Sequence, residues 1–173
     1  EDAVRAAESG AEGVGLVRTE FMFLDRADLP DEDEQVEAYR AIMGPFPTGP
    51  VVFRTLDVGG DKQLPAVEIA PELNPFLGKR GIRLTLAEPE IFRTQLRAIL
   101  RAGAGRMVQV MFPMVASPAE VRAARRILEE VEAELDRAGI ERATDIEVGV
   151  MIEVHSAALI ADLLADPAHL SST

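Results

Sequence analysis

The sequence lacks cysteine and tryptophan altogether and has few aromatic residues of any kind. Its 173 residues include no Cys, no Trp, one Tyr and seven Phe. Without a thiol the chain can form no disulfide bond, no thiolate zinc site and no cysteine nucleophile. The absence of cysteine agrees with a reducing compartment, and we expect a cytoplasmic protein. With so few rings, the core has to consist mainly of small aliphatic side chains.

Positive charge is also scarce, because 30 acidic residues outnumber 18 basic ones and give a formal net charge of −12. Nucleic acids and anionic membranes attract basic surfaces, so we expect neither as a partner. No apolar run approaches the ~18 residues of a membrane-spanning helix, and no signal-peptide pattern opens the sequence. A small anion can still bind to an acidic protein where a few cations converge.

Strand and helix patterns alternate along the chain. The expected strands are 13–17, 51–58, 107–112 and 146–152. The expected helices are 2–9, 31–43, 89–102, 117–139 and 156–164. Strands separated by helices predict a parallel sheet. Four such strands suit either an open doubly wound sheet or half of a (β/α)₈ barrel, and the pattern leaves both open. Both ends of the sequence look cut, because each lies in or just after a helix.

Local signals mark two helix starts and one long connection. Asp31 with Glu34, and Ser117 with Glu120, have the spacing of a capping box, in which each side chain bonds the other residue's backbone N–H. The connection 59–87 contains four Gly, three Pro and the one Asn of the sequence. Connections of that length in compact domains are usually functional.

Charged residues stand where three of the expected strands end. Arg18 follows the first strand, Arg54 lies in the second, and Glu153 follows the fourth. In parallel α/β folds, ligands bind at the carboxyl ends of the strands. Arginine grips phosphate with two parallel N–H bonds, and a nearby carboxylate tolerates that anion when Mg²⁺ bridges them. The three residues therefore predict a phosphate-bearing ligand held by arginine and a metal.

A second interpretation of the same residues is purely structural. Arg18 and Arg54 could pair with Glu20 and Asp57 as salt bridges at the strand ends, and Glu153 could cap the following helix. Buried or half-buried charges need such partners whether or not they bind a ligand. The pattern alone leaves both interpretations open.

Six segments, in order, resemble one bacterial enzyme family. They are GAEGVGLVRTEF at 10–21, RTLDVGGDKQLP at 54–65, NPFLGKRGIR at 74–83, QLRAILRA at 95–102, MFPM at 111–114 and GVMIE at 149–153. Each is similar to a segment of Enzyme I, the phosphoenolpyruvate–protein phosphotransferase of the sugar phosphotransferase system. Six ordered motifs are far more specific than any one of them.

The resemblance implies a fold, a reaction and site residues. The fold would be a partial (β/α)₈ TIM barrel with about four of the eight parallel strands, and 1–173 would be an incomplete phosphoenolpyruvate-binding domain with no second domain. The parent enzyme would pass the phosphoryl group of phosphoenolpyruvate to a histidine on a separate phosphocarrier domain, the first step of sugar uptake. By resemblance, Arg18, Arg54 and Arg80 would bind substrate and Glu153 would bind Mg²⁺.

The resemblance also shows what is missing from these residues. The family's acceptor histidine, second metal carboxylate and catalytic cysteine are absent, so no residue here is assigned a catalytic role and we expect the fragment to be inactive alone. Half a barrel has bare strand edges, so we expect a homo-oligomer. Lys62 and Asn74 lie in matching motifs without an assigned role. His155 and His169 are expected to be exposed or supporting residues.

Several alternatives remain open at this point. Pyruvate phosphate dikinase and phosphoenolpyruvate synthase carry related segments, although GGDKQLP at 59–65 favours Enzyme I. A lyase of the same barrel superfamily would bind a metal at a strand-end Glu but would not need paired arginines. A non-catalytic module derived from Enzyme I is a further possibility. The pathway that the parent serves does not follow from these residues.

Overall fold

A computed structural model describes residues 2–24, 26–59, 74 and 78–165. Its strands are β1 (Val14–Arg18), β2 (Val51–Arg54), β3 (Met107–Phe112) and β4 (Asp145–Val150). Its helices are α1 (Asp2–Glu8), the 3₁₀ helix η1 (Thr19–Met22), α2 (Glu32–Met43), α3 (Ile82–Ala87), α4 (Pro89–Ala102), α5 (Pro118–Arg137), α6 (His155–Leu159) and α7 (Ala161–Leu164). The predicted alternation of strands and helices is confirmed.

The four strands form one sheet in the order β1-β2-β3-β4, and all neighbours are parallel. A doubly wound sheet reverses its strand order at a switch point, whereas a (β/α)₈ barrel adds each strand beside the last. The sequential order therefore favours the barrel. It resolves the choice that the strand count had left open.

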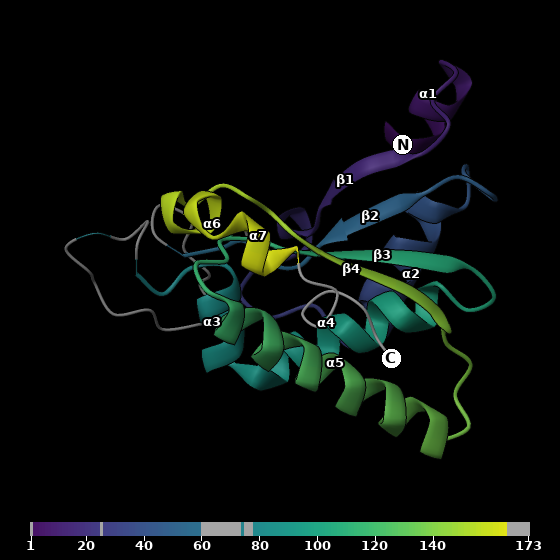
Figure 1. The fold of residues 1–173 in the computed structure, drawn as a ribbon. Helices are drawn as coiled ribbons and strands as arrows, with labels where there is room; N and C mark the ends of the chain where they lie inside the picture. Colours follow the sequence, from purple (N-terminus) through teal and green to yellow (C-terminus); the bar gives the residue numbers. More distant parts are fainter. Residues whose placement is uncertain (1, 25, 60–73, 75–77, 166–173) are drawn as a thin grey trace.

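One face of the sheet carries the core. Figure 1 shows α2, α4 and α5 on the same side of the strands. The ring of Phe53 in β2 packs edge-on against Tyr39 of α2, with centroids 5.0 Å apart, and Phe112 in β3 packs against Phe92 of α4 at 5.9 Å. The alternate residues, such as Gln109 of β3, are only half-buried. In the described part of the chain, these helices cover one face of the sheet; in a partial barrel the other face would line the interior.

Local sequence signals were correct for the helix starts. Asp31 and Ser117 each accept a hydrogen bond from the backbone N–H three residues on, and Glu34 and Glu120 complete both capping boxes. The helix 89–102 and the strand 107–112 have the predicted bounds. Within the described ranges, no helix combines the length and the hydrophobicity needed to cross a bilayer.

Other boundaries were predicted wrongly. The strand expected at 51–58 ends at Arg54 because β1 turns into η1 there and leaves β2 without a neighbour on that side. The strand at 146–152 runs from Asp145 to Val150, and the helix at 156–164 is interrupted at Ile160. Two short helices, η1 and α3, were not predicted, because neither is long enough to show a periodic pattern.

Candidate functional site

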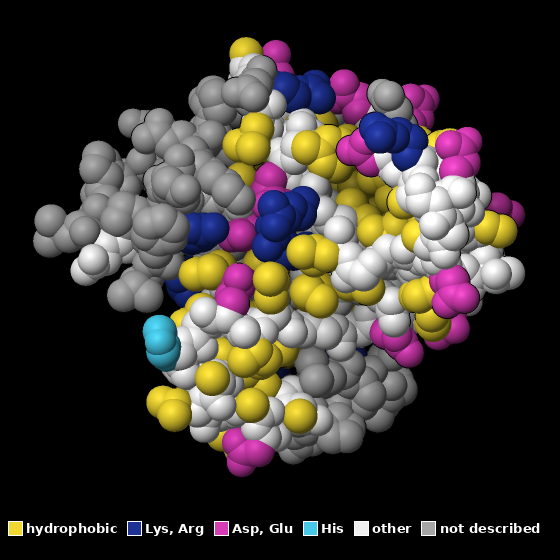
Figure 2. Space-filling view, turned by 90° about the horizontal axis from the view of Figure 1, so that it is seen from above, with side chains coloured by type: hydrophobic (Ala, Val, Ile, Leu, Met, Phe, Trp, Pro, Cys, Tyr) yellow, Lys and Arg dark blue, Asp and Glu magenta, His cyan; other side chains and the backbone are white. Residues whose placement is uncertain are grey.

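Arg18 and Arg54 are neighbours at the carboxyl ends of β1 and β2. They are register partners in the parallel ladder, so both side chains leave the sheet on the same face. That face is the one opposite Phe53, away from the helices. Figure 2 looks onto it and shows Lys and Arg side chains near the middle, beside acidic side chains and among hydrophobic ones. Arg18 is exposed, whereas Arg54 is only 5% exposed.

Two buried carboxylates hold the Arg54 guanidinium. Its Nη2 donates a short hydrogen bond to Glu20 of η1, and its Nη1 lies 3.5 Å from Oδ2 of Asp57. Nη1 also contacts the sulfur of Met151, just beyond β4, at 3.7 Å. The structural pairing that the sequence left open is therefore present for Arg54. Arg18, in contrast, makes no ion pair with any of the described residues.

Asp57 joins a second arginine to this group. Its Oδ1 accepts a hydrogen bond from Nε of Arg80 at 3.0 Å, and its Oδ2 accepts one from Nη2 at 3.3 Å. Two glycines with positive φ bring the Arg80 backbone this close: a Cβ on Gly59 would lie 2.9 Å from the Cα of Arg80, and one on Gly81 would lie 2.9 Å from Met114. One carboxylate thus orients both Arg54 and Arg80.

Glu153 lies at the same carboxyl-terminal end of the strands, three residues beyond β4. It is exposed, and its Oε1 accepts a hydrogen bond from the backbone N–H of Met114 at 2.8 Å. The Met114 carbonyl in turn accepts from Nη1 of Arg83 at 3.1 Å. Met114 has a φ of 57°, a conformation that costs a non-glycine residue free energy and that is often found at functional sites. Glu153 therefore reaches across to the end of β3 instead of into the first turn of α6.

The described residues contain no complete cluster of metal-binding side chains. No three His, Asp or Glu side chains come together as a metal-binding group within the parts of the chain that the structure describes. Glu153 is an oxygen ligand of the kind Mg²⁺ prefers, and Mg²⁺ commonly uses only one or two protein carboxylates. Glu153 fits as one ligand of such a site, not as a complete site.

The remaining candidates are spread more widely. Asn74 is exposed, and His155 is the exposed first residue of α6, as expected of a surface histidine. Lys62 and His169 lie outside the described residues. No contact among the described residues brings Asn74 or His155 to the Arg18–Arg54 pair.

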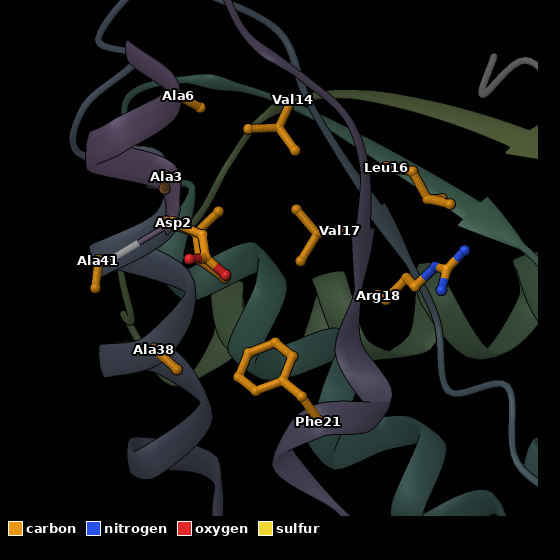
Figure 3. Close-up of a pocket in the computed structure, with 11 residues that line it drawn as sticks. Asp2, Ala3, Ala6, Val14, Leu16, Val17, Arg18, Phe21, Ala38 and Ala41 are labelled. Atoms are coloured by element: carbon orange, nitrogen blue, oxygen red, sulfur yellow. The ribbon is translucent and has the colours of Figure 1, made fainter. Parts of the chain in front are cut away.

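A groove of about 560 Å³ lies beside β1 and is lined by residues of α1, α2 and β1, with Arg18 among them. Figure 3 shows Val17 and Phe21 pointing into it toward small residues of α1 and α2, while Leu16 and Arg18 extend from the opposite side of the strand. Its walls are mostly apolar side chains. Among the described residues that line the groove, Arg18 is the single cation, whereas Arg54 and Arg80 lie together outside it, so the arginine cluster is the better candidate site for an anion.

A buried amide beneath the site was missed by the sequence analysis. Gln95 of α4 is fully buried and is hydrogen-bonded to Thr19, Tyr39 and the backbone N–H of Leu56. Burial raises the pKa of the Tyr39 phenol well above its ordinary value, and the hydrogen bond from Gln95 opposes this only in part. The available signal was a glutamine at a core position of an otherwise apolar helix face, inside the QLRAILRA motif.

Comparisons with known proteins show which proteins the chain is similar to. The family model described as "PEP-utilising enzyme, PEP-binding domain" matches residues 1–172. A phosphoenolpyruvate-protein phosphotransferase of Staphylococcus carnosus is 52% identical over 158 residues, which is 91% of this chain and 28% of that protein. Its counterpart in Bacillus subtilis is 50% identical over 165 residues, covering 95% and 29%. A multiphosphoryl transfer protein of Rhodobacter capsulatus is 50% identical over 164 residues, covering 95% and 19%.

The extent of these matches identifies the family and the part of it that is present. The chain spans less than a third of the length of these relatives. The family match nevertheless covers nearly every residue, and the resemblance to Enzyme I drawn from six motifs is confirmed. The chain belongs to the PEP-utilising enzymes and corresponds to their PEP-binding domain.

Proposed function

We propose that the chain is the phosphoenolpyruvate-binding part of a protein phosphotransferase that passes the phosphoryl group to a histidine on a phosphocarrier domain. The observation that carries this proposal is the gathering of Arg18, Arg54 and Arg80 at one edge of the sheet. The relatives that match most of the chain are named as phosphotransferases of this substrate. Sugar uptake and a cytoplasmic location are proposed on the same basis.

In this proposal the arginines bind the phosphate and spread its charge during transfer. Arg18 is the exposed cation of the register pair, so it meets the ligand first. Arg54 and Arg80 are more buried and are held in place by Asp57. Fixed cations of this kind stabilise a phosphoryl group in transfer without having to reorganise. The neighbouring carboxylates fix the direction of the guanidinium groups, which is the positioning that phosphoryl transfer needs.

Glu153 is the proposed protein ligand of Mg²⁺. Its carboxylate stands exposed at the same edge and is oriented by the Met114 N–H through one of its two oxygens. Bound Mg²⁺ would supply positive charge near the enolate oxygen of the substrate. The oxygens of the substrate and water, or further groups beyond the described residues, would complete the coordination.

Calorimetric titration of the full-length gene product with phosphoenolpyruvate and with oxalate, each with and without Mg²⁺, tests the proposal. We expect Arg18→Gln to weaken phosphoenolpyruvate binding at least tenfold, since a charge-assisted pair of N–H bonds to phosphate is lost. Arg122→Gln is the matched control. Like Arg18, Arg122 is exposed and makes no ion pair with any of the described residues, but it lies in α5 and not at the carboxyl ends of the strands. If both variants bind phosphoenolpyruvate as tightly as the parent, Arg18 does not contribute to binding and the proposed site is wrong.

Pyruvate release from phosphoenolpyruvate can be measured separately for the full-length gene product and for the isolated chain. The full-length gene product should release pyruvate from phosphoenolpyruvate when a histidine-bearing phosphocarrier and Mg²⁺ are supplied. The isolated 173-residue chain should not, because no acceptor histidine of the family motif is present in it. Turnover by the isolated chain would show that these residues are catalytically sufficient and would overturn this part of the proposal.

A further inference from the structure

Gln95 closes a ring of hydrogen bonds around the end of β2. Its Oε1 accepts from the backbone N–H of Leu56 at 2.8 Å, and its Nε2 donates to Oγ1 of Thr19 at 3.0 Å. Thr19 then donates its hydroxyl to the carbonyl oxygen of Arg54 at 2.8 Å. Only Thr55 separates Arg54 from Leu56 in the chain. The ring therefore grips the backbone on both sides of one residue.

The ring stands where the β1–β2 ladder stops. Arg18 and Arg54 are the last register pair of these two strands. Beyond them, the Thr55 N–H still bonds to Met111 of β3 at 3.0 Å, but on the β1 side no strand remains. Side chains of Thr19 and Gln95 take over the bonds that a neighbouring strand would otherwise provide. A buried backbone N–H or carbonyl left without these partners would destabilise the folded state by its full desolvation cost.

The direction of every bond in this network is determined. Because the Leu56 N–H requires an acceptor, the Gln95 oxygen faces it and the amide NH₂ faces Thr19 and Tyr39. Tyr39 then donates to Oε1 of Gln35 at 3.1 Å. The side chains involved are at most 1% exposed. Water is therefore not available as a substitute partner.

We propose that Gln95 is a positioning residue for the phosphate-binding arginines. Through Thr19 it fixes the residue between Arg18 and Glu20, and through Leu56 it fixes the residue before Asp57. One amide in α4 thus sets the spacing between the two strand ends that carry the cationic cluster. This inference rests on the proposed function. It gives a role to Gln95 of the QLRAILRA motif, although no residue of that motif is among the proposed phosphate ligands.

The test compares two variants of equal burial in the full-length gene product. Gln95→Met keeps the length of the side chain but leaves the Leu56 N–H without its acceptor and Oγ1 of Thr19 without the N–H that Gln95 donates. Tyr39→Phe removes a hydroxyl from the same network on its α2 side and leaves the ring around β2 intact. We expect the KM for phosphoenolpyruvate to rise at least tenfold in Gln95→Met, because displacement of a binding group by about 1 Å costs up to a hundredfold. Tyr39→Phe should lower the Tm while KM stays within about twofold of the parent.

Thr19 supplies a second, independent pair of variants. Thr19→Val has nearly the same shape but cannot bond to the Arg54 carbonyl or accept from Gln95, so KM should rise as in Gln95→Met. Thr19→Ser retains the hydroxyl and should restore most of the affinity. This pair decides the question if Gln95→Met fails to fold.

The outcomes are distinguishable. An unchanged KM in folded Gln95→Met or Thr19→Val, with only a lower Tm, would mean that the ring is structural and would overturn the inference. An equal rise of KM in Tyr39→Phe would do the same, because the effect would then not depend on the strand ends. If the parent protein shows no phosphoenolpyruvate-dependent transfer, the proposed function fails first and the positioning role fails with it.

Discussion

Replacing Arg54 should reduce both binding and stability, and a second substitution should separate the two effects. The Arg54 side chain is 6% exposed, and those of its partners Glu20 and Asp57 are both 4% exposed. Arg54→Met removes the cation between two buried carboxylates. Breaking a buried ion pair from one side costs about 3–5 kcal/mol, because the remaining charge is desolvated without compensation. For a chain of this size each kcal/mol lowers Tm by about 2–4 °C, so we expect a Tm decrease of roughly 6–20 °C.

The compensating substitution is Glu20→Gln. A neutral amide has nearly the shape of the carboxylate and carries no negative charge that depends on the Arg54 cation, so the double variant should recover part of the lost stability. Asp57 keeps its bonds to Arg80 in either variant. Phosphoenolpyruvate binding should stay weak in the double variant, because the Arg54 cation is still missing. Loss of binding together with recovered stability is the signature of an arginine with both roles.

Chemical denaturation of the parent, the two single variants and the double variant gives the coupling free energy directly. Titration calorimetry on the same four proteins gives the binding. If the double variant is as unstable as the sum of the single variants, the pair is not what Arg54 contributes to stability. If binding returns with stability, Arg54 supports the site without contacting the phosphate.

Three further predictions concern the fold. Tyr39 is the single tyrosine of the sequence, and burial raises its pKa. The part of the free energy of unfolding that depends on the neutral phenol is therefore complete below about pH 10 and is lost as pH rises above that value. Tyrosinate absorbance of the 173-residue chain should therefore appear together with loss of circular dichroism, and titration near pH 10 in a folded chain would contradict this. Ser117→Ala should cost about 1 kcal/mol in urea denaturation, since it removes the capping bond to Glu120; an unchanged midpoint would show that α5 does not depend on its cap. The 173-residue chain should also self-associate through its uncovered sheet face and strand edges, so light scattering should give a mass above 18.7 kDa, and a folded monomer at high concentration would refute this.

The sequence by itself determined the features that depend on near neighbours. Both capping boxes, the bounds of α4 and those of β3 followed from residues a few positions apart. The parallel α/β class followed from the alternation of elements, and the family followed from six ordered motifs. These motifs also placed Arg18, Arg54 and Glu153 at strand ends, which in a parallel sheet means one common edge.

Only the tertiary structure decided how the charges at that edge are used. Arg54 pairs with Glu20 and Asp57, whereas Arg18 is paired with neither, and no pattern in the sequence distinguishes the two arginines. The choice depends on which side chains are buried together. Apart from Asp57, which is three positions from Arg54, they come from distant segments, such as Glu20 and Arg54, 34 positions apart, and Thr19 and Gln95, 76 positions apart. Strand order, which separates a barrel from a doubly wound sheet, is likewise a property of long-range pairing. Hydrophobic periodicity and capping are local, but the partner of a buried polar group is fixed only when distant elements pack.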